Sequence, residues 1–172
     1  MLRNKIFTAV AGVWLTFSVA HGAERQLSFA VDGVVTRLLV KPGMQVQAGT
    51  PLAELDRRVF QAELEAATQQ HKAATLNYEL AQQGWQRLRQ LYDDLNASKQ
   101  ELEEAQLLLA RAKAEQAATH RDLTLAQWRL GYSQLVAPTA GRIQAIPGFV
   151  GQVLNAQSGM APVIILETNI KE

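Results

Sequence analysis

Four side chains near the middle of the chain have the chemistry to contact a partner. Arg87 and Leu91 are four residues apart, Ser98 follows seven residues later, and Leu95 lies between them. A guanidinium donates several hydrogen bonds to carboxylates or carbonyl oxygens, and a leucine side chain gains free energy when it leaves water. Their stretch, RLRQLYDDLNAS, separates two long helical patterns. The stretch is therefore predicted to be a turn with an apolar surface.

Each of these residues also has an ordinary structural interpretation. Ser98 opens SKQE, a capping box in which the serine hydroxyl caps the amide near Glu101 and the glutamate reaches back. Arg87 could be a solvated helix charge, and Leu91 could widen a helix–helix contact. Taken together, their spacing and their place at a predicted tip favour a docking surface, with Leu95 exposed at its apex.

The rest of the sequence offers no catalytic constellation. We find no nucleophile–histidine pair, no paired carboxylates in a plausible pocket and no phosphate-binding loop, so we expect a protein that is not an enzyme. The absence of cysteine removes disulfides, thiol catalysis and thiolate metal sites. A net charge of +1 gives no support to nucleic-acid binding. We expect no cofactor and no metal.

The elements that must position the turn are two helices. Residues 57–131 are rich in Ala, Gln, Glu, Leu, Arg and Lys, and contain no proline. Two ladders of seam positions at alternating spacings of four and three indicate coiled-coil packing. They are Phe60, Leu64, Ala67, His71, Ala74, Tyr78, Ala81, Trp85 and Leu88, and then Leu102, Ala105, Leu109, Ala112, Gln116, Thr119, Leu123, Ala126 and Leu130.

The two ladders are mirror images of each other. Every seam position finds a seam partner when paired residue numbers sum to 190, so Leu88 meets Leu102 and His71 meets Thr119. This register predicts an antiparallel hairpin with its tip at residues 94–97 and Asp56 as the first N-cap. The polar pair His71–Thr119 costs stability but fixes register. We interpret His71 as a core histidine, since His21 and His120 offer no obvious partner ligands.

The segments on either side of the helices resemble each other. Residues 27–56 and 132–168 are both Val/Leu-rich runs with Gly and Pro punctuation, which indicates strands and tight turns. Gly33 and Gly43 recur as Gly141 and Gly151 at an offset of 108. These glycines are interpreted as structural residues that supply positive φ at turns. Because two or three short strands are marginal alone, the two halves should pack into one small β-sandwich or flattened barrel.

The N-terminus has the pattern of an export signal. A basic start, MLRNK, precedes an apolar run over residues 6–20 that is short for a membrane span and ends in small residues. We expect a cleaved signal peptide over residues 1–20, with a cut after residue 22 as the second choice. An uncleaved anchor helix is the alternative.

The whole arrangement resembles a known family, the HlyD-type periplasmic adaptors or membrane fusion proteins. The resemblance rests on GVVTRLLVKPGMQVQAGTPLAELD and on LVAPTAGRIQAI with GFVGQV, which match the two halves of a lipoyl-like domain. In these adaptors an α-helical hairpin interrupts the domain, as it does here. The implied fold is α+β: a small lipoyl-like β-sandwich built from two sequence halves and interrupted by a long antiparallel coiled-coil hairpin.

The resemblance also implies a function for the opening residues. Adaptors of tripartite efflux pumps carry an Arg, a Leu four residues later and a Ser seven residues after that, and Arg87, Leu91 and Ser98 stand at this spacing. In the family these residues dock on the helical tip of a TolC-type outer-membrane channel. The expected partners are that channel, an inner-membrane transporter and further copies of the adaptor in a hexameric ring or trimer of dimers, in the periplasm of a Gram-negative cell.

Two features depart from related domains and keep alternatives open. Lipoyl and biotinyl carriers attach their cofactor to a lysine between the two halves, where this chain has the hairpin, so a carrier is one alternative and a secreted coiled-coil scaffold is another. In complete adaptors a β-barrel domain follows the second half. Residues 169–172 are therefore expected to be a stub where that domain would start, in a chain that is either truncated or minimal.

Overall fold

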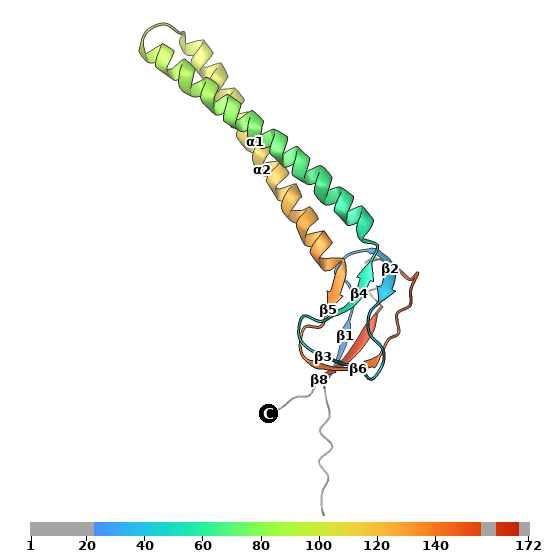
Figure 1. Cartoon of the computed structure of the whole chain (residues 1–172). Helices are drawn as coiled ribbons and strands as arrows, with labels where there is room; N and C mark the ends of the chain where they lie inside the picture. The colour runs from blue at the N-terminus through green and yellow to red at the C-terminus, as the bar shows by residue number, and fades with distance from the viewer. Residues whose placement is uncertain (1–22, 156–160, 169–172) are drawn as a thin grey trace, which may run out of the picture.

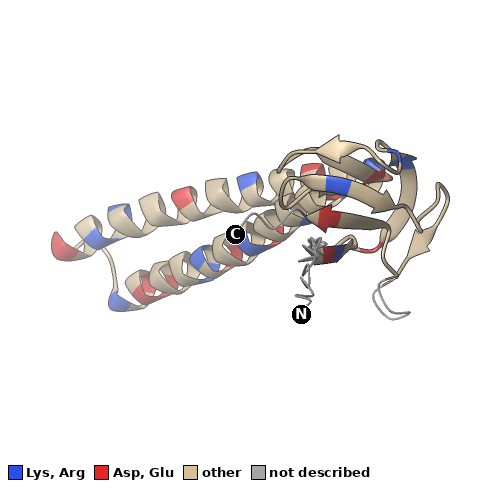
Figure 2. Ribbon diagram, turned by 90° about the horizontal axis from the view of Figure 1, so that it is seen from below, with Lys and Arg blue, Asp and Glu red and all other residues tan. Residues whose placement is uncertain are grey.

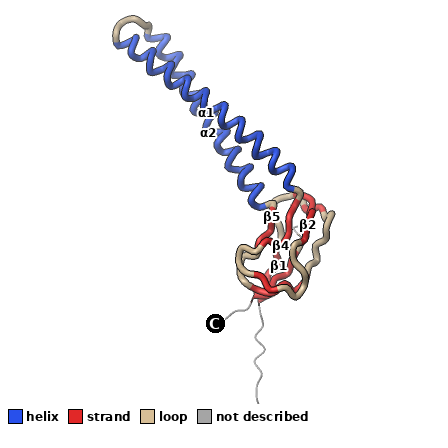
Figure 3. The backbone as a smooth tube through the Cα atoms, viewed as in Figure 1, coloured by secondary structure: helices blue, strands red, loops and turns tan. Residues whose placement is uncertain are grey.

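A small β domain carries one long helical hairpin that projects from it (Figure 1). The computed structural model describes residues 23–155 and 161–168. Figure 3 shows the strands gathered at one end and the two helices forming the rest of the described chain. The α+β class, with helices inserted between two β segments, is confirmed.

The described residues form eight strands and two helices. The strands are β1 (Ala23–Leu27), β2 (Gly33–Leu38), β3 (Gln45–Val46), β4 (Pro51–Leu55), β5 (Gln134–Val136), β6 (Gly141–Ala145), β7 (Val153–Leu154) and β8 (Ile164–Thr168). The helices α1 (Arg57–Asp93) and α2 (Lys99–Tyr132) lie between β4 and β5.

Each of the two sheets combines strands from both halves of the sequence. Their strand orders are β1-β8-β6-β3 and β5-β4-β2-β7, with antiparallel pairing throughout. The two orders correspond strand by strand. In each corresponding pair the strand numbers differ by four, so β1, β8, β6 and β3 of the first sheet match β5, β4, β2 and β7 of the second. Backbone hydrogen bonds follow the same symmetry: the Gly43 amide donates to Ile143 O over 2.7 Å, and the Gly151 amide donates to Val35 O over 2.8 Å. Both donors and acceptors differ by 108, so the internal repeat is confirmed.

The four repeat glycines divide into two structural roles. Gly43 and Gly151 have φ of 84° and 92°, as predicted for turns. The prediction was wrong for Gly33 and Gly141, which open strands β2 and β6 without positive φ. Their reason is close packing: a Cβ on Gly33 would lie 3.1 Å from Leu55 Cδ1, and one on Gly141 would overlap the carbonyl oxygen of Glu167.

The core of the β domain lies between the sheets and reaches the base of the hairpin. Its fully buried side chains include Val35, Leu55, Ile143 and Leu166, which come from strands of both halves. Phe60, in the first turns of α1, belongs to the same cluster, and Leu130 near the end of α2 packs against it. The predicted first seam layer, Phe60 with Leu130, therefore anchors the hairpin to the sandwich.

The hairpin seam follows the predicted ladders along its whole length. All 18 seam positions are buried or half-buried, whereas most residues between them are exposed. The side chains of His71 and Thr119 meet, with Nδ1 and Oγ1 3.2 Å apart. This contact across 48 residues confirms the register in which paired numbers sum to 190. With 37 residues, α1 is roughly 55 Å long at a rise of 1.5 Å per residue.

The β domain begins at Ala23, earlier than predicted. β1 covers Ala23–Leu27 and pairs with β8, whereas the first half is predicted to start at residue 27. The strand has four exposed residues in its sequence AERQL, so no alternation of apolar residues marked it as a strand. The expected signal peptide (1–20 or 1–22) and the expected stub (169–172) lie outside the described residues.

Candidate functional site

The far end of the hairpin is a five-residue loop, residues 94–98, between α1 and α2. Its backbone satisfies the last carbonyl groups of α1: the amides of Leu95 and Asn96 donate to Tyr92 O and Leu91 O over 3.0 and 2.7 Å. The loop is the point of the described chain farthest from the β domain (Figure 1). The hairpin therefore holds its tip one helix length away from the β domain, where the tip is free to contact a partner.

Leu95 is the most unusual residue of the loop. Its φ is 61°, the left-handed conformation, and no other non-glycine residue in the described chain has a positive φ. Its side chain is 92% exposed. Both properties are unfavourable for leucine, since the conformation crowds Cβ and exposure leaves apolar surface in water. Packing within the described chain gives no reason for leucine at this position.

Ser98 is the N-cap of α2, as its sequence context predicts. Its hydroxyl accepts from the Glu101 amide over 3.2 Å and donates to Glu101 Oε2 over 2.7 Å. The Ser98 amide also donates to Glu101 Oε2, over 2.7 Å, and completes a capping box. Hydrogen bonds from the Ser98 amide and hydroxyl lower the pKa of the Glu101 carboxyl. The Ser98 hydroxyl proton is therefore already used inside the turn.

Arg87 and Leu91 lie one helical turn apart on the flank of α1 beside the seam. Arg87 is exposed and has no hydrogen bond or ion pair with another described residue, while Leu91 is 39% exposed. Tyr92 next to Leu91 is half-buried. The structure thus brings Arg87, Leu91 and Leu95 to the same end of the rod, and leaves Ser98 committed to the turn.

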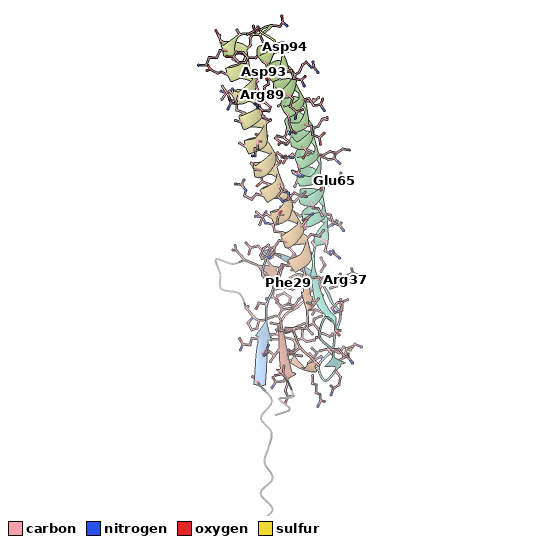
Figure 4. All side chains as sticks on the ribbon, turned by 90° about the vertical axis from the view of Figure 1, so that its left-hand side faces the viewer. Phe29, Arg37, Glu65, Arg89, Asp93 and Asp94 are labelled. Atoms are coloured by element: carbon pink, nitrogen blue, oxygen red, sulfur yellow. The ribbon has the colours of Figure 1, made fainter. Side chains whose placement is uncertain are left out.

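Charge at the tip is mixed, and part of it opposes helix stability. Asp93 is the last residue of α1 and Asp94 is its C-cap, and Figure 4 shows both near the tip with Arg89. Carboxylates at a helix C-terminus are unfavourable because the carbonyl ends carry partial negative charge. The Arg89 guanidinium lies 5.4 Å from the Trp85 ring centre. Asp93 and Asp94 were not among the predicted site residues, although two acidic residues at a predicted helix end are a signal in the sequence.

Away from the tip, Lys, Arg, Asp and Glu are interspersed along both helices (Figure 2). The predicted structural residues Trp85, Leu88 and Leu102 are half-buried in the seam behind the tip. Within residues 23–155 and 161–168 no group of three metal-ligating side chains occurs. The same residues contain no helix long and apolar enough to cross a membrane. A cleft of about 470 Å³ lies at the hairpin base, lined by Asp56, Phe60, Trp128 and Arg129 among others.

Residues 26–166 match the family model of the barrel-sandwich hybrid domain of RND membrane fusion proteins. The chain belongs to this family of membrane fusion proteins. A multidrug resistance protein, MdtA of Pectobacterium carotovorum, is 33% identical over 138 residues, which cover 80% of this chain and 33% of MdtA. This membrane fusion protein chain thus spans about a third of the length of the curated relatives it matches.

Solved structures of membrane fusion proteins have the same arrangement of β domain and hairpin. A MacA–MexA chimera that contains the Pseudomonas aeruginosa MexA α-hairpin is 26% identical, with a TM-score of 0.51, and the match covers 85% of this chain and 46% of the chimera. The membrane fusion protein Spr0693 of Streptococcus pneumoniae R6 has a TM-score of 0.67 over 86% of this chain and 60% of its own. At 18% identity, the second likeness concerns the fold alone.

Proposed function

We propose that this membrane fusion protein chain is a periplasmic adaptor of a tripartite efflux system, and that its hairpin tip docks on a TolC-type outer-membrane channel. The observation that carries the proposal is Leu95, an exposed leucine in an unfavourable backbone conformation at the apex. Strained backbone conformations of this kind cluster at functional sites. The family membership and the MdtA likeness support an efflux role.

Arg87 and Leu91 extend the docking surface along one side of the tip. The guanidinium, which has no partner among the described residues, donates to backbone carbonyls or carboxylates of the channel, and the Leu91 side chain is buried against apolar channel residues. Ser98 contributes by fixing the turn through its capping box. Its role is to position Leu95 and the start of α2.

The adaptor would assemble side by side with copies of itself, in a hexameric ring or a trimer of dimers. Support for lateral packing comes from exposed apolar residues on the outer flanks of the hairpin. On α1 these include Leu76 and Leu80, which are one turn apart and 56% and 57% exposed. On α2 the 3.6-residue period puts Leu107, Leu125, Trp128 and Tyr132 on one outer flank. An inner-membrane transporter would be the third component of the proposed system.

A charge reversal at the tip tests the docking proposal against a scaffold function. Arg87→Asp should abolish resistance in cells that express the complete pump, because the docking guanidinium becomes a carboxylate. Arg111→Asp is the matched control, since Arg111 is an exposed arginine on the shaft of α2. Circular dichroism of both purified variants should show unchanged helix content. Full resistance with folded Arg87→Asp would favour a scaffold that has no channel partner.

A further inference from the structure

Two histidines from opposite arms of the hairpin lie together, a contact that was not predicted from the sequence. The ring centres of His71 on α1 and His120 on α2 are 5.2 Å apart, with the ring planes inclined at 49°. The register explains the contact, because His120 directly follows Thr119, the seam partner of His71. His120 is exposed and His71 half-buried, so solvent reaches the pair from one flank.

Hydrogen bonding determines which nitrogen of His71 is available. The Thr119 hydroxyl lies 3.1 Å from Glu115 O and 3.0 Å from Gln116 O, carbonyl oxygens that only accept. Because the single hydroxyl proton is donated there, Thr119 Oγ1 accepts from His71 Nδ1–H over 3.2 Å. Neutral His71 then keeps the lone pair on Nε2. An imidazole whose other N–H is held by an oxygen is the arrangement seen in metal-ligating histidines.

The spacing of the two rings fits a shared metal ion. Nitrogen–metal bonds of 2.0–2.1 Å put the centres of two imidazoles on one tetrahedral ion roughly 5–6 Å apart. The measured 5.2 Å lies in this range. No third His, Cys, Asp or Glu joins them in the part of the chain that the structure describes. Water would therefore complete the coordination sphere, and the ion would exchange readily.

We propose that His71 and His120 form a two-imidazole site that binds a divalent transition metal ion across the two arms of the hairpin. Imidazole suits Cu²⁺, Ni²⁺ and Zn²⁺, and Cu²⁺ binds most tightly of the three. The ion links α1 to α2 at the polar His71–Thr119 layer of the seam. Occupancy therefore stiffens the rod at its middle, and this consequence does not depend on the docking proposal.

Titration of the untagged chain with CuSO₄ or ZnCl₂ tests the site. Isothermal calorimetry should show one ion per chain, and NMR should show the imidazole signals of His71 and His120 changing together. The midpoint of thermal unfolding should rise with the metal.

Variants separate this pair from the third histidine of the chain. His120→Ala, at an exposed position, and His71→Asn should each weaken Cu²⁺ binding by about tenfold or more while helix content is retained. His21→Ala, made in the full 172-residue chain that retains this residue, is the matched control and should change nothing. Thr119→Val removes the acceptor of Nδ1–H and should weaken binding less than loss of a ligand. Absence of binding, or binding that survives His120→Ala and disappears with His21→Ala, would overturn the proposal.

Discussion

At the tip, single residues separate what the fold requires from what a partner requires. Leu95→Gly removes an apolar side chain that is 92% exposed and relieves a φ of 61°. Glycine accepts this conformation without strain, so the free energy of unfolding should stay the same or rise by about 1 kcal/mol. Binding to a TolC-type channel should nevertheless weaken. Chemical denaturation and a channel-binding assay measure the two effects.

Asn96→Gly is the control for this substitution. It adds the same flexibility to the neighbouring exposed position of the loop and leaves Leu95 in place. Channel binding should be retained. Equal loss of binding in both variants would mean that loop rigidity, and not the leucine side chain, is what the partner requires.

Ser98 makes a pH-dependent contribution to the turn. Because the folded-state pKa of Glu101 is lowered by its bonds to Ser98, this contribution is complete above the unfolded pKa of about 4.3 and is lost as pH falls through the folded pKa. Ser98→Ala should reduce the free energy of unfolding by about 1 kcal/mol near pH 7. The difference from wild type should shrink near pH 3. A difference that is constant with pH would contradict the capping box.

At the scale of elements, the shaft of the hairpin contains a weak point at Gly84. This glycine lies inside α1, and a Cβ added there would meet nothing within 4 Å. Gly84→Ala should therefore raise the free energy of unfolding by about 0.5–1 kcal/mol, since glycine loses more conformational entropy in a helix. Gly131→Ala, in the last turn of α2 with equally open surroundings, should give a smaller gain. A lower free energy of unfolding in Gly84→Ala would contradict this account, because it would require a steric clash where the structure leaves open space around the added Cβ.

The hairpin could be predicted well because its pattern is long and redundant. Eighteen seam positions at regular spacing fix the register, and the His71–Thr119 contact agrees with it. The contact of His120 with His71 was missed because His120 is not itself a seam residue. Likewise, the positive φ of Leu95 could not be foreseen, since leucine carries no signal for that conformation.

At the scale of the whole molecule, the β domain is two similar halves that exchange strands. The symmetry makes Gly33 and Gly141 a matched pair, since they open the equivalent strands β2 and β6. A Cβ on Gly141 would overlap the backbone of Glu167, whereas one on Gly33 would press on the end of the Leu55 side chain at 3.1 Å. Gly141→Ala should lower the free energy of unfolding by about 2–4 kcal/mol and Gly33→Ala by about 1 kcal/mol. Thermal unfolding of both variants measures the ratio, and equal losses would contradict the packing described.

The repeat itself was visible in the sequence, but its architecture was less so. Glycine and proline spacing predicted two halves in one sandwich, while the exchange of strands between sheets depends on pairings far apart in the chain. β1 escaped prediction because its exposed residues carry no apolar alternation. Positive φ was wrongly predicted for Gly33 and Gly141. Their glycines are required by close packing against another strand, which a single sequence does not reveal.

The most direct test of the docking proposal is single-cysteine cross-linking, because the chain has no cysteine of its own. Leu91→Cys and Leu95→Cys should each form a cross-link to a tip residue of the outer-membrane channel in cells with an intact pump. Gln69→Cys, exposed on the shaft far from the tip, should not. Cross-links from the two tip positions and none from Gln69→Cys are the predicted result. Folded tip variants that give no channel cross-link, while the pump still exports, would contradict the account.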